Sequence, residues 1–171
     1  SSSVSLFVQE EQSADDELDV ESPEDVGFLA LASGTLRGME YVVEEDPIGE
    51  AGTAVTAVEL PTTGDLWAQA RFSQPLDNPV VVMGPASAFG GDPGDVRIRN
   101  VTSQGFEYRF DEWDSRNGYH DNAENVGWVA FEEGVWELDN GLTVVAREVQ
   151  LNEVATQFTW SADLGPAPAV F

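Results

Sequence analysis

The chain has 171 residues, 42% of them hydrophobic, and a formal net charge of −25 at pH 7. Its 32 acidic residues stand against seven basic ones, all of them arginine, and the sequence contains neither lysine nor cysteine. Because so negative a chain repels phosphate backbones and anionic lipid, we expect neither nucleic acid nor another polyanion as a partner. Disulfides and thiolate metal sites are excluded. No apolar run reaches the roughly 18 residues of a membrane-spanning helix, so we expect no membrane insertion.

Abundant acidic residues without lysine resemble the composition of proteins from extreme halophiles. In such organisms molar salt screens the self-repulsion that otherwise destabilises so charged a fold. The alternative is an acidic extracellular protein from ordinary conditions. The composition favours a salt-adapted protein, which we expect to loosen at low salt.

Short apolar stretches separated by Gly, Pro, Asn and Asp predict β-strands along the whole chain. Taken in chain order, they lie near 4–10, 26–31, 54–60, 66–72, 79–83, 95–101, 126–131, 142–147 and 155–160. A further strand is indicated where Phe106, Tyr108 and Phe110 alternate with charged residues, a period of two that places three aromatic rings on one face. Since no segment has a helical apolar stripe, we predict an all-β fold, an antiparallel β-sandwich or barrel.

The sequence also repeats itself. EDVGFLALASG at 24–34 returns as ENVGWVAFEEG at 124–134, and FSQPLDNPVVV at 72–82 returns as WSADLGPAPAVF at 160–171. These repeats predict a complete β-sandwich unit at 51–150, the C-terminal half of a repeat at 1–50, and the N-terminal half of a following repeat at 151–171.

A half-sandwich exposes an apolar face and unpaired strand edges, so each half-repeat needs a partner. The two halves close on each other within one chain, or the end of one molecule completes the next in a filament or ring, or neighbours in a longer tandem array supply the missing strands. All three routes remain open at this point. The second of them predicts self-association through the terminal half-repeats.

The stretch 71–131 resembles the H-type lectin domain. It reads RFSQPLDNPVVVMGP, then DVRIRNVTSQGFEYRFDEWD, then VGWVAF. The elements follow the order of that family: a Pro-Val strand, an Arg-containing strand, a Gly-Phe turn, a strand ending in Trp-Asp and a closing Trp. The resemblance implies a six-stranded antiparallel β-sandwich that binds terminal sugars such as galactose or N-acetylgalactosamine, often as a trimer. In this chain the segment after Arg97 is shorter and the loop after Trp113 is longer and more acidic, so the sugar specificity does not carry over.

The same resemblance places Arg97, Trp113 and Asp114 at the binding edge. An arginine there grips hydroxyls with two parallel donors, an indole stacks on the apolar face of a sugar, and a carboxylate accepts from neighbouring hydroxyls. Two alternatives remain open: Arg97 is a surface charge facing an acidic residue on the next strand, and Trp113 is a core residue at the end of a strand.

Two more candidates, Tyr119 and His120, lie in the loop after Trp113 and are within reach of the same ligand. For His120, the single histidine, the alternative is simple solvation in the loop. Trp128 also matches the family, but Val126 and Ala130 flank it at a period of two, so we predict that it belongs to the core.

Other motifs are weaker. Asn100, Val101 and Thr102 form an N-glycosylation sequon whose alternative role is a strand-to-turn connection. Asp92 and Asp95 offer oxygen ligands to calcium but fall short of the six to eight that this ion takes, which leaves the question of a metal undecided. Asp111 and Glu112 point to opposite faces of a strand and cannot act on one substrate together. With no catalytic constellation, we expect neither an enzyme nor a cofactor.

These features predict a secreted, salt-adapted protein located outside the cell or on its surface. Its function would be to recognise extracellular or cell-surface glycans through Arg97, Trp113, Asp114, Tyr119 and His120. The alternative is a structural subunit of an extracellular filament, coat or appendage, assembled by strand complementation between half-repeats.

Overall fold

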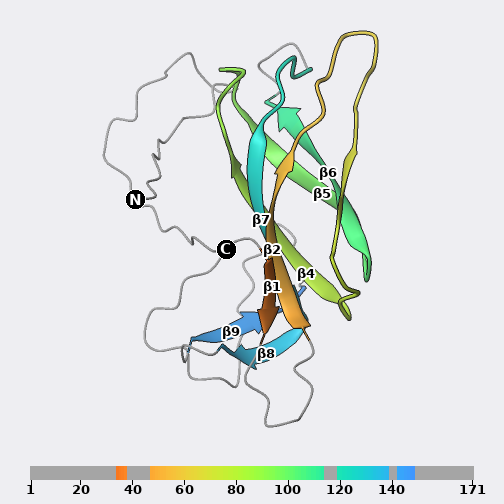
Figure 1. Cartoon of the computed structure of the whole chain (residues 1–171). Helices are drawn as coiled ribbons and strands as arrows, with labels where there is room; N and C mark the ends of the chain where they lie inside the picture. The colour runs from red at the N-terminus through yellow and green to blue at the C-terminus, as the bar shows by residue number, and fades with distance from the viewer. Residues whose placement is uncertain (1–33, 38–46, 114–118, 139–141, 149–171) are drawn as a thin grey trace, which may run out of the picture.

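Two antiparallel sheets face each other across the core in the computed structural model, which describes residues 34–37, 47–113, 119–138 and 142–148. Within those residues the strands are β1 (Gly34–Arg37), β2 (Pro47–Val55), β3 (Ala68–Arg71), β4 (Pro79–Ala86), β5 (Gly94–Thr102), β6 (Gly105–Glu112), β7 (Asn125–Glu132), β8 (Gly134–Glu137) and β9 (Thr143–Ala146). One sheet has the order β1-β2-β7-β4 and the other β3-β6-β5, while β8 and β9 form a separate hairpin (Figure 1). The predicted all-β sandwich is therefore confirmed. The strands predicted near 4–10, 26–31 and 155–160 lie outside the described residues.

Aromatic rings fill the space between the two sheets. Phe106 and Tyr108 point inward from β6, and Trp128 and Ala130 point inward from β7 to meet them. The Trp128 ring lies 5.5 Å from that of Phe106 and 5.8 Å from that of Phe72, which are favourable separations for aromatic pairs. Trp128 is only 8% exposed, so its predicted place in the core is confirmed.

β2 differs from its predicted position. A strand was predicted near 54–60, but β2 spans Pro47–Val55 and pairs along its length with β7. Its Pro, Gly and Ala residues have low strand propensity, which is why the pattern missed it. The glycines are nevertheless required, because a Cβ on Gly49 would lie 2.4 Å from the carbonyl oxygen of Ala130 and one on Gly52 would lie 2.5 Å from the Trp128 ring.

The paired strands also bear on the domain boundary. β2 runs through the predicted boundary between residues 50 and 51, and β1 from the preceding segment pairs with β2. Residues 34–37 and 47–50 thus belong to the same sheet as the central unit.

Candidate binding site

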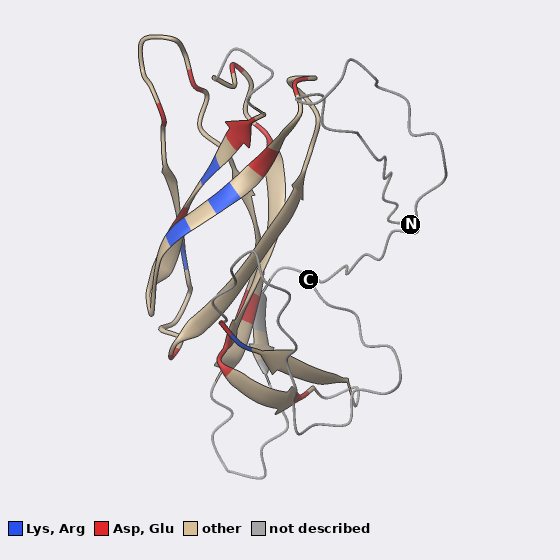
Figure 2. Cartoon of the chain, turned by 180° about the vertical axis from the view of Figure 1, so that it is seen from behind, with Lys and Arg blue, Asp and Glu red and all other residues tan. Residues whose placement is uncertain are grey.

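The β3-β6-β5 sheet presents a polar face to solvent, which we call the outward face. Alternation directs Ala68, Ala70 and Ile98 into the core. The residues between them point outward: Gln69 and Arg71 on β3, Asp95, Arg97 and Arg99 on β5, and Glu107, Arg109 and Asp111 on β6. Basic and acidic residues lie close to one another along these strands, as the blue and red segments of the ribbon show (Figure 2).

Arg97, a predicted site residue, lies in the middle of this face. Its Nε donates to Asp111 Oδ2 at 3.1 Å, and its side chain remains 57% exposed. Asp111 Oδ1 also accepts from Arg109 Nη2 at 2.6 Å, and Arg109 Nη1 lies 2.6 Å from Asp65. Arg97 thus pairs with an acid on the neighbouring strand, as the alternative reading predicted, and its terminal nitrogens are left on the solvent side.

Arg99 is held in the same manner, two residues along β5. Its Nε donates to Glu107 Oε2 at 2.8 Å, and its guanidinium lies 3.9 Å from the centre of the Trp67 ring. The hydrogen bond from Arg99, together with one from Asn100, lowers the pKa of Glu107 below its ordinary value. Glu107 therefore stays ionised, and Trp67 and Glu107 jointly fix the direction of the arginine.

Trp113 lies where the outward face meets the loop after β6. It is half-buried, and its indole N–H donates to Asp95 Oδ2 at 3.3 Å. Asp95 and Asp111 are direct partners in the β5–β6 ladder. Two like charges in that position repel each other, and the donors from Arg97, Arg109 and Trp113 offset the repulsion. Arg97 and Trp113 are thus each held by one of two acids that lie directly opposite each other in the sheet.

The other three predicted residues are Asp114, Tyr119 and His120. Asp114 lies outside the described residues, and Tyr119 is half-buried in the loop before β7. His120 is buried, with 1% of its surface exposed, and both ring nitrogens face carboxylates. The alternative of a solvated loop histidine is wrong, because the ring packs at 4.3 Å from Phe110, inside the fold. In this arrangement it offers no free nitrogen to a ligand.

His120 instead occupies a buried junction between loops. Its Nδ1 lies 3.2 Å from Glu112 Oε1 and its Nε2 lies 2.9 Å from Glu124 Oε1, and all three side chains are 1% exposed. Glu112 thus points inward and Asp111 outward, as the period of two predicted. The other oxygen of Glu112, Oε2, is buried without a partner among the described residues.

Glu124 connects this junction to the loop between β4 and β5. Its carboxylate accepts from Ser87 Oγ, from the backbone N–H of Phe89 at 3.0 Å and from that of Gly90 at 2.8 Å. Burial raises the pKa of Glu124, but these hydrogen bonds and the one from His120 outweigh burial and lower it below the ordinary value. The residue is therefore held as a carboxylate.

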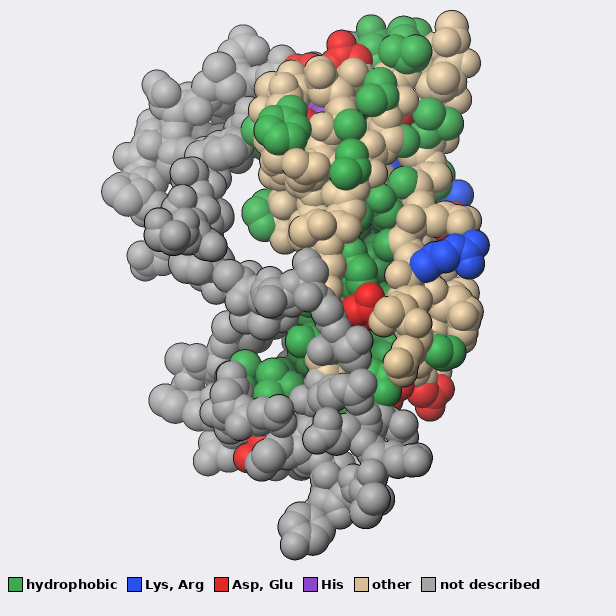
Figure 3. Space-filling view, in the orientation of Figure 1, with side chains coloured by type: hydrophobic (Ala, Val, Ile, Leu, Met, Phe, Trp, Pro, Cys, Tyr) green, Lys and Arg blue, Asp and Glu red, His purple; other side chains and the backbone are tan. Residues whose placement is uncertain are grey.

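The loop after β2 is tied to the same junction. Thr56 N donates to Glu124 O at 2.9 Å, and Glu59 N donates to His120 O at 2.7 Å. Three loops consequently meet at one end of the sandwich, where hydrophobic side chains reach the surface (Figure 3). Phe89, 66% exposed, is the most exposed of the large hydrophobic residues that the structure describes.

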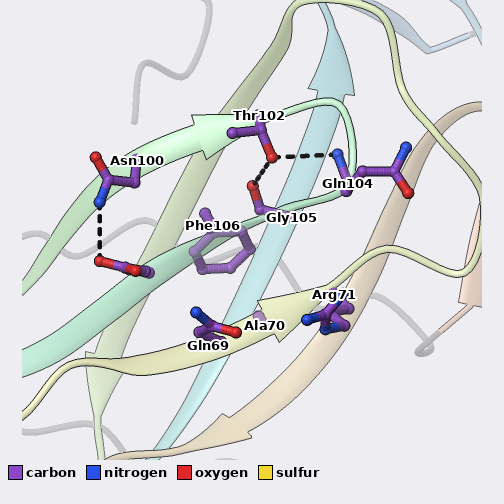
Figure 4. Close-up of a pocket in the computed structure, with 9 residues that line it drawn as sticks. Gln69, Ala70, Arg71, Asn100, Thr102, Gln104, Gly105 and Phe106 are labelled. Carbon is purple, nitrogen blue, oxygen red and sulfur yellow. Dashed lines mark hydrogen bonds between the residues drawn. The ribbon is translucent and has the colours of Figure 1, made fainter.

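A shallow hollow lies at the opposite end of the outward face, beside the β5–β6 turn (Figure 4). Arg71, Asn100 and Gln104 line it together with Gln69. Within the sequon, Asn100 Nδ2 donates to Glu107 Oε2 and Thr102 Oγ1 donates to Gly105 O at 3.1 Å. The sequon residues thus take part in the turn, which was the alternative role.

The calcium hypothesis gains no support. Asp95 accepts from Trp113, and no group of three or more His, Cys, Asp or Glu side chains suited to a metal occurs among the described residues. Within the same residues no helix is long and apolar enough to cross a membrane.

Several residues of the outward face and the junction escaped the sequence analysis. Trp67 and Arg99 gave no motif signal, although the alternation of charges at Glu107, Arg109 and Asp111 already indicated a polar face. Glu124 lies in a repeated phrase, but its contact with His120 depends on how two loops meet, which no local pattern encodes.

No family model matches the sequence, and no solved structure matches it. One stretch of the chain resembles halomucin. The similarity to this protein of Haloquadratum walsbyi (strain DSM 16790 / HBSQ001) is 34% identity over 90 residues, which covers 48% of this chain. The chain spans only about 1% of the length of halomucin. This similarity fits the salt-adapted composition and an extracellular protein.

Proposed function

We propose that the chain is a glycan-binding module of a salt-adapted extracellular protein. We propose further that a sugar rests against Trp113, where β5 begins and β6 ends. The proposal is carried by one observation: the half-buried Trp113 indole is bonded to Asp95, which lies directly opposite Asp111, the partner of the exposed Arg97. An anchored aromatic ring beside polar donors and acceptors is the usual arrangement of a sugar site.

The arrangement assigns a task to each group. The indole supplies an apolar surface for the C–H groups of a sugar ring. The terminal nitrogens of Arg97 supply donors for hydroxyl oxygens, and Asp95 and Asp111 supply acceptors for hydroxyl protons. Because each of these groups is already bonded to a partner, Trp113 to Asp95 and Arg97 to Asp111, little side-chain entropy is lost when a ligand binds.

A glycan array in molar potassium chloride, followed by titration of tryptophan fluorescence with the glycans that bind, tests the proposal. Trp113→Ala should weaken binding by about tenfold or more, since loss of a buried aromatic anchor commonly removes over 1 kcal/mol. Trp113→Phe keeps an aromatic ring and should retain most of the affinity. An array without bound glycans, or equal affinity of Trp113→Ala and the parent, would contradict the proposal.

The alternative, assembly by strand addition, is supported by β1. This strand comes from the predicted half-repeat at 1–50 and adds to the edge of the central sheet. If such addition also joins molecules, light scattering in molar salt should detect assemblies that disappear on deletion of residues 1–37. A particle of monomer mass before and after the deletion would count against this function.

A further inference from the structure

The arginines of this chain are concentrated on the outward face. Four of the seven, Arg71, Arg97, Arg99 and Arg109, project from it. The acids that project from the same three strands are Asp95, Glu107 and Asp111, whereas the whole chain carries 32 acids. The strong negative charge of the molecule is therefore offset locally on this face.

The acids of the face do not oppose an incoming anion as free charges would. Glu107 accepts from Arg99 and Asn100, Asp111 accepts from two arginines, and Asp95 accepts from Trp113. These bonds use the Nε of Arg97 and of Arg99 and leave both side chains about half exposed, at 57% and 49%. The acids thus position the arginines, whose terminal nitrogens remain on the solvent side.

The face also forms a continuous stripe along β6. On the β5 side of β6, Arg97 lies opposite Arg109 and Arg99 lies opposite Glu107. On the β3 side, Arg71 lies opposite Gly105, near the turn. From Gly105 to Trp113 the stripe is about 27 Å long at roughly 3.4 Å per residue. Arg71 closes it at the hollow of Figure 4, where Gln69 and Gln104 add amide groups.

We propose that this face binds an acidic glycan, one whose sugars carry carboxylate groups, and that Arg71, Arg97 and Arg99 receive those carboxylates. The proposal rests on the proposed function, because Trp113 holds one end of the same ligand. A guanidinium group matches a carboxylate with two parallel N–H donors. The arginines of the outward face thus revise the expectation, drawn from the net charge of the whole chain, that every polyanion is repelled.

Measuring binding in molar salt separates direct contacts from long-range electrostatic effects. In molar salt the screening length falls to about 3 Å, so general attraction or repulsion by distant charges contributes little. Binding that persists there and depends on single arginines must come from direct contact. The probe is polygalacturonate, and its methyl ester is the matched neutral polymer with the same backbone.

The variants are chosen to leave the fold intact. Arg71→Gln removes an exposed guanidinium that has no ion-pair partner within the described residues. Arg99→Gln removes one placed by Trp67 and Glu107. Arg147→Gln is the control: it makes the same charge change at a 63% exposed arginine after β9, outside the outward face. Urea denaturation checks that all three fold equally well.

We expect the parent to bind polygalacturonate about tenfold more tightly than the ester, and Arg71→Gln and Arg99→Gln each to weaken that binding several-fold, as charged contacts do. Arg147→Gln should bind like the parent. Equal binding of acid and ester, equal loss in Arg147→Gln, or equal binding of polyglutamate would overturn the proposal. Neutral glycans bound through Trp113 alone would overturn this inference and leave the proposed function standing, whereas no bound glycan at all would remove both.

Discussion

His120 and Glu124 form a hydrogen-bonded pair inside the protein, with Nε2 and Oε1 2.9 Å apart and both side chains 1% exposed. A second carboxylate, that of Glu112, faces the other ring nitrogen at 3.2 Å. Both ring nitrogens of His120 therefore lie within hydrogen-bond distance of a buried carboxylate oxygen. This junction holds together the loops beside which the proposed site is built.

Replacing the histidine should therefore destabilise the fold. His120→Ala leaves two buried acids facing each other without a donor between them. Leaving a buried hydrogen-bonding group without its partner commonly costs about 1–3 kcal/mol, and more where that group is charged. Urea denaturation in molar potassium chloride should show that loss in the free energy of unfolding.

Asn122→Ala is a suitable control, because Asn122 is exposed in the same loop. Its side-chain amide donates a hydrogen bond to its neighbour Asp121. It should change the free energy of unfolding by less than about 0.5 kcal/mol. Equal stability of His120→Ala and Asn122→Ala would mean that the junction does not hold the loops.

The lowered pKa of Glu124 predicts an acid-sensitive contribution to stability. Burial raises this pKa, but hydrogen bonds from Ser87, Phe89, Gly90 and His120 outweigh it and bring the pKa below the ordinary value of 4.5. The unfolded state therefore takes up the proton first. Stability from Glu124 is fully present above the unfolded-state pKa and is lost as pH falls through the folded-state pKa.

The measurement is urea denaturation from neutral to acidic pH on the parent and on Glu124→Gln. The variant should be less stable at neutral pH, and the difference between the two proteins should shrink as the pH falls below about 4.5. Glu137→Gln removes the same charge from an exposed position and is the control. A parent–variant difference that is constant over the whole pH range would argue against this role of Glu124.

Gly90 is predicted to be a position where a methyl group is not tolerated. A Cβ there would lie 2.5 Å from His120 Cε1 and 2.7 Å from Nε2, and the ring is fixed by two carboxylates. Overpacking of this kind costs roughly 1–3 kcal/mol. Thermal unfolding of Gly90→Ala should therefore begin at a lower temperature than that of the parent.

Gly127→Ala provides the matched comparison. No atom lies within 4 Å of a Cβ added at Gly127, which is in β7. Reduced freedom of the unfolded chain should leave this variant as stable as the parent or about 0.4–1 kcal/mol more stable. If Gly90→Ala and Gly127→Ala unfolded at the same temperature, the close packing of Gly90 on His120 would not limit the stability of the fold.

The fold was predictable where side chains alternate clearly. Phe106, Tyr108 and Phe110 indicated β6 and its inward face, and Trp128 was recognised as core from Val126 and Ala130 beside it. β2 was not recognised, because its glycines are set by close contacts with β7 that only the tertiary structure defines.

The site was predictable only in part, for a related reason. Arg97 and Trp113 follow strand positions, and the sheet brings them together through Asp95 and Asp111. His120 lies in a loop, where sequence gives no period from which to infer burial. Its environment arises from Glu124 reaching backbone groups more than 30 residues away in the chain.

The net charge of −25 predicts that stability rises with salt. Self-repulsion among exposed acids opposes folding, and its range falls from about 10 Å at 0.1 M salt to about 3 Å at 1 M. The exposed ion pairs of Arg97 and Arg99 are weakened by the same screening, but pairs of this kind contribute little to stability. Repulsion among 32 acids should dominate, so the urea midpoint should increase steeply over this range and level off above it. Sucrose is the control, because it stabilises proteins by exclusion from their surface and does not screen charge. If sucrose raised the urea midpoint as much as potassium chloride does, charge repulsion would not limit this fold. A urea midpoint that stayed constant between the two salt concentrations would lead to the same conclusion.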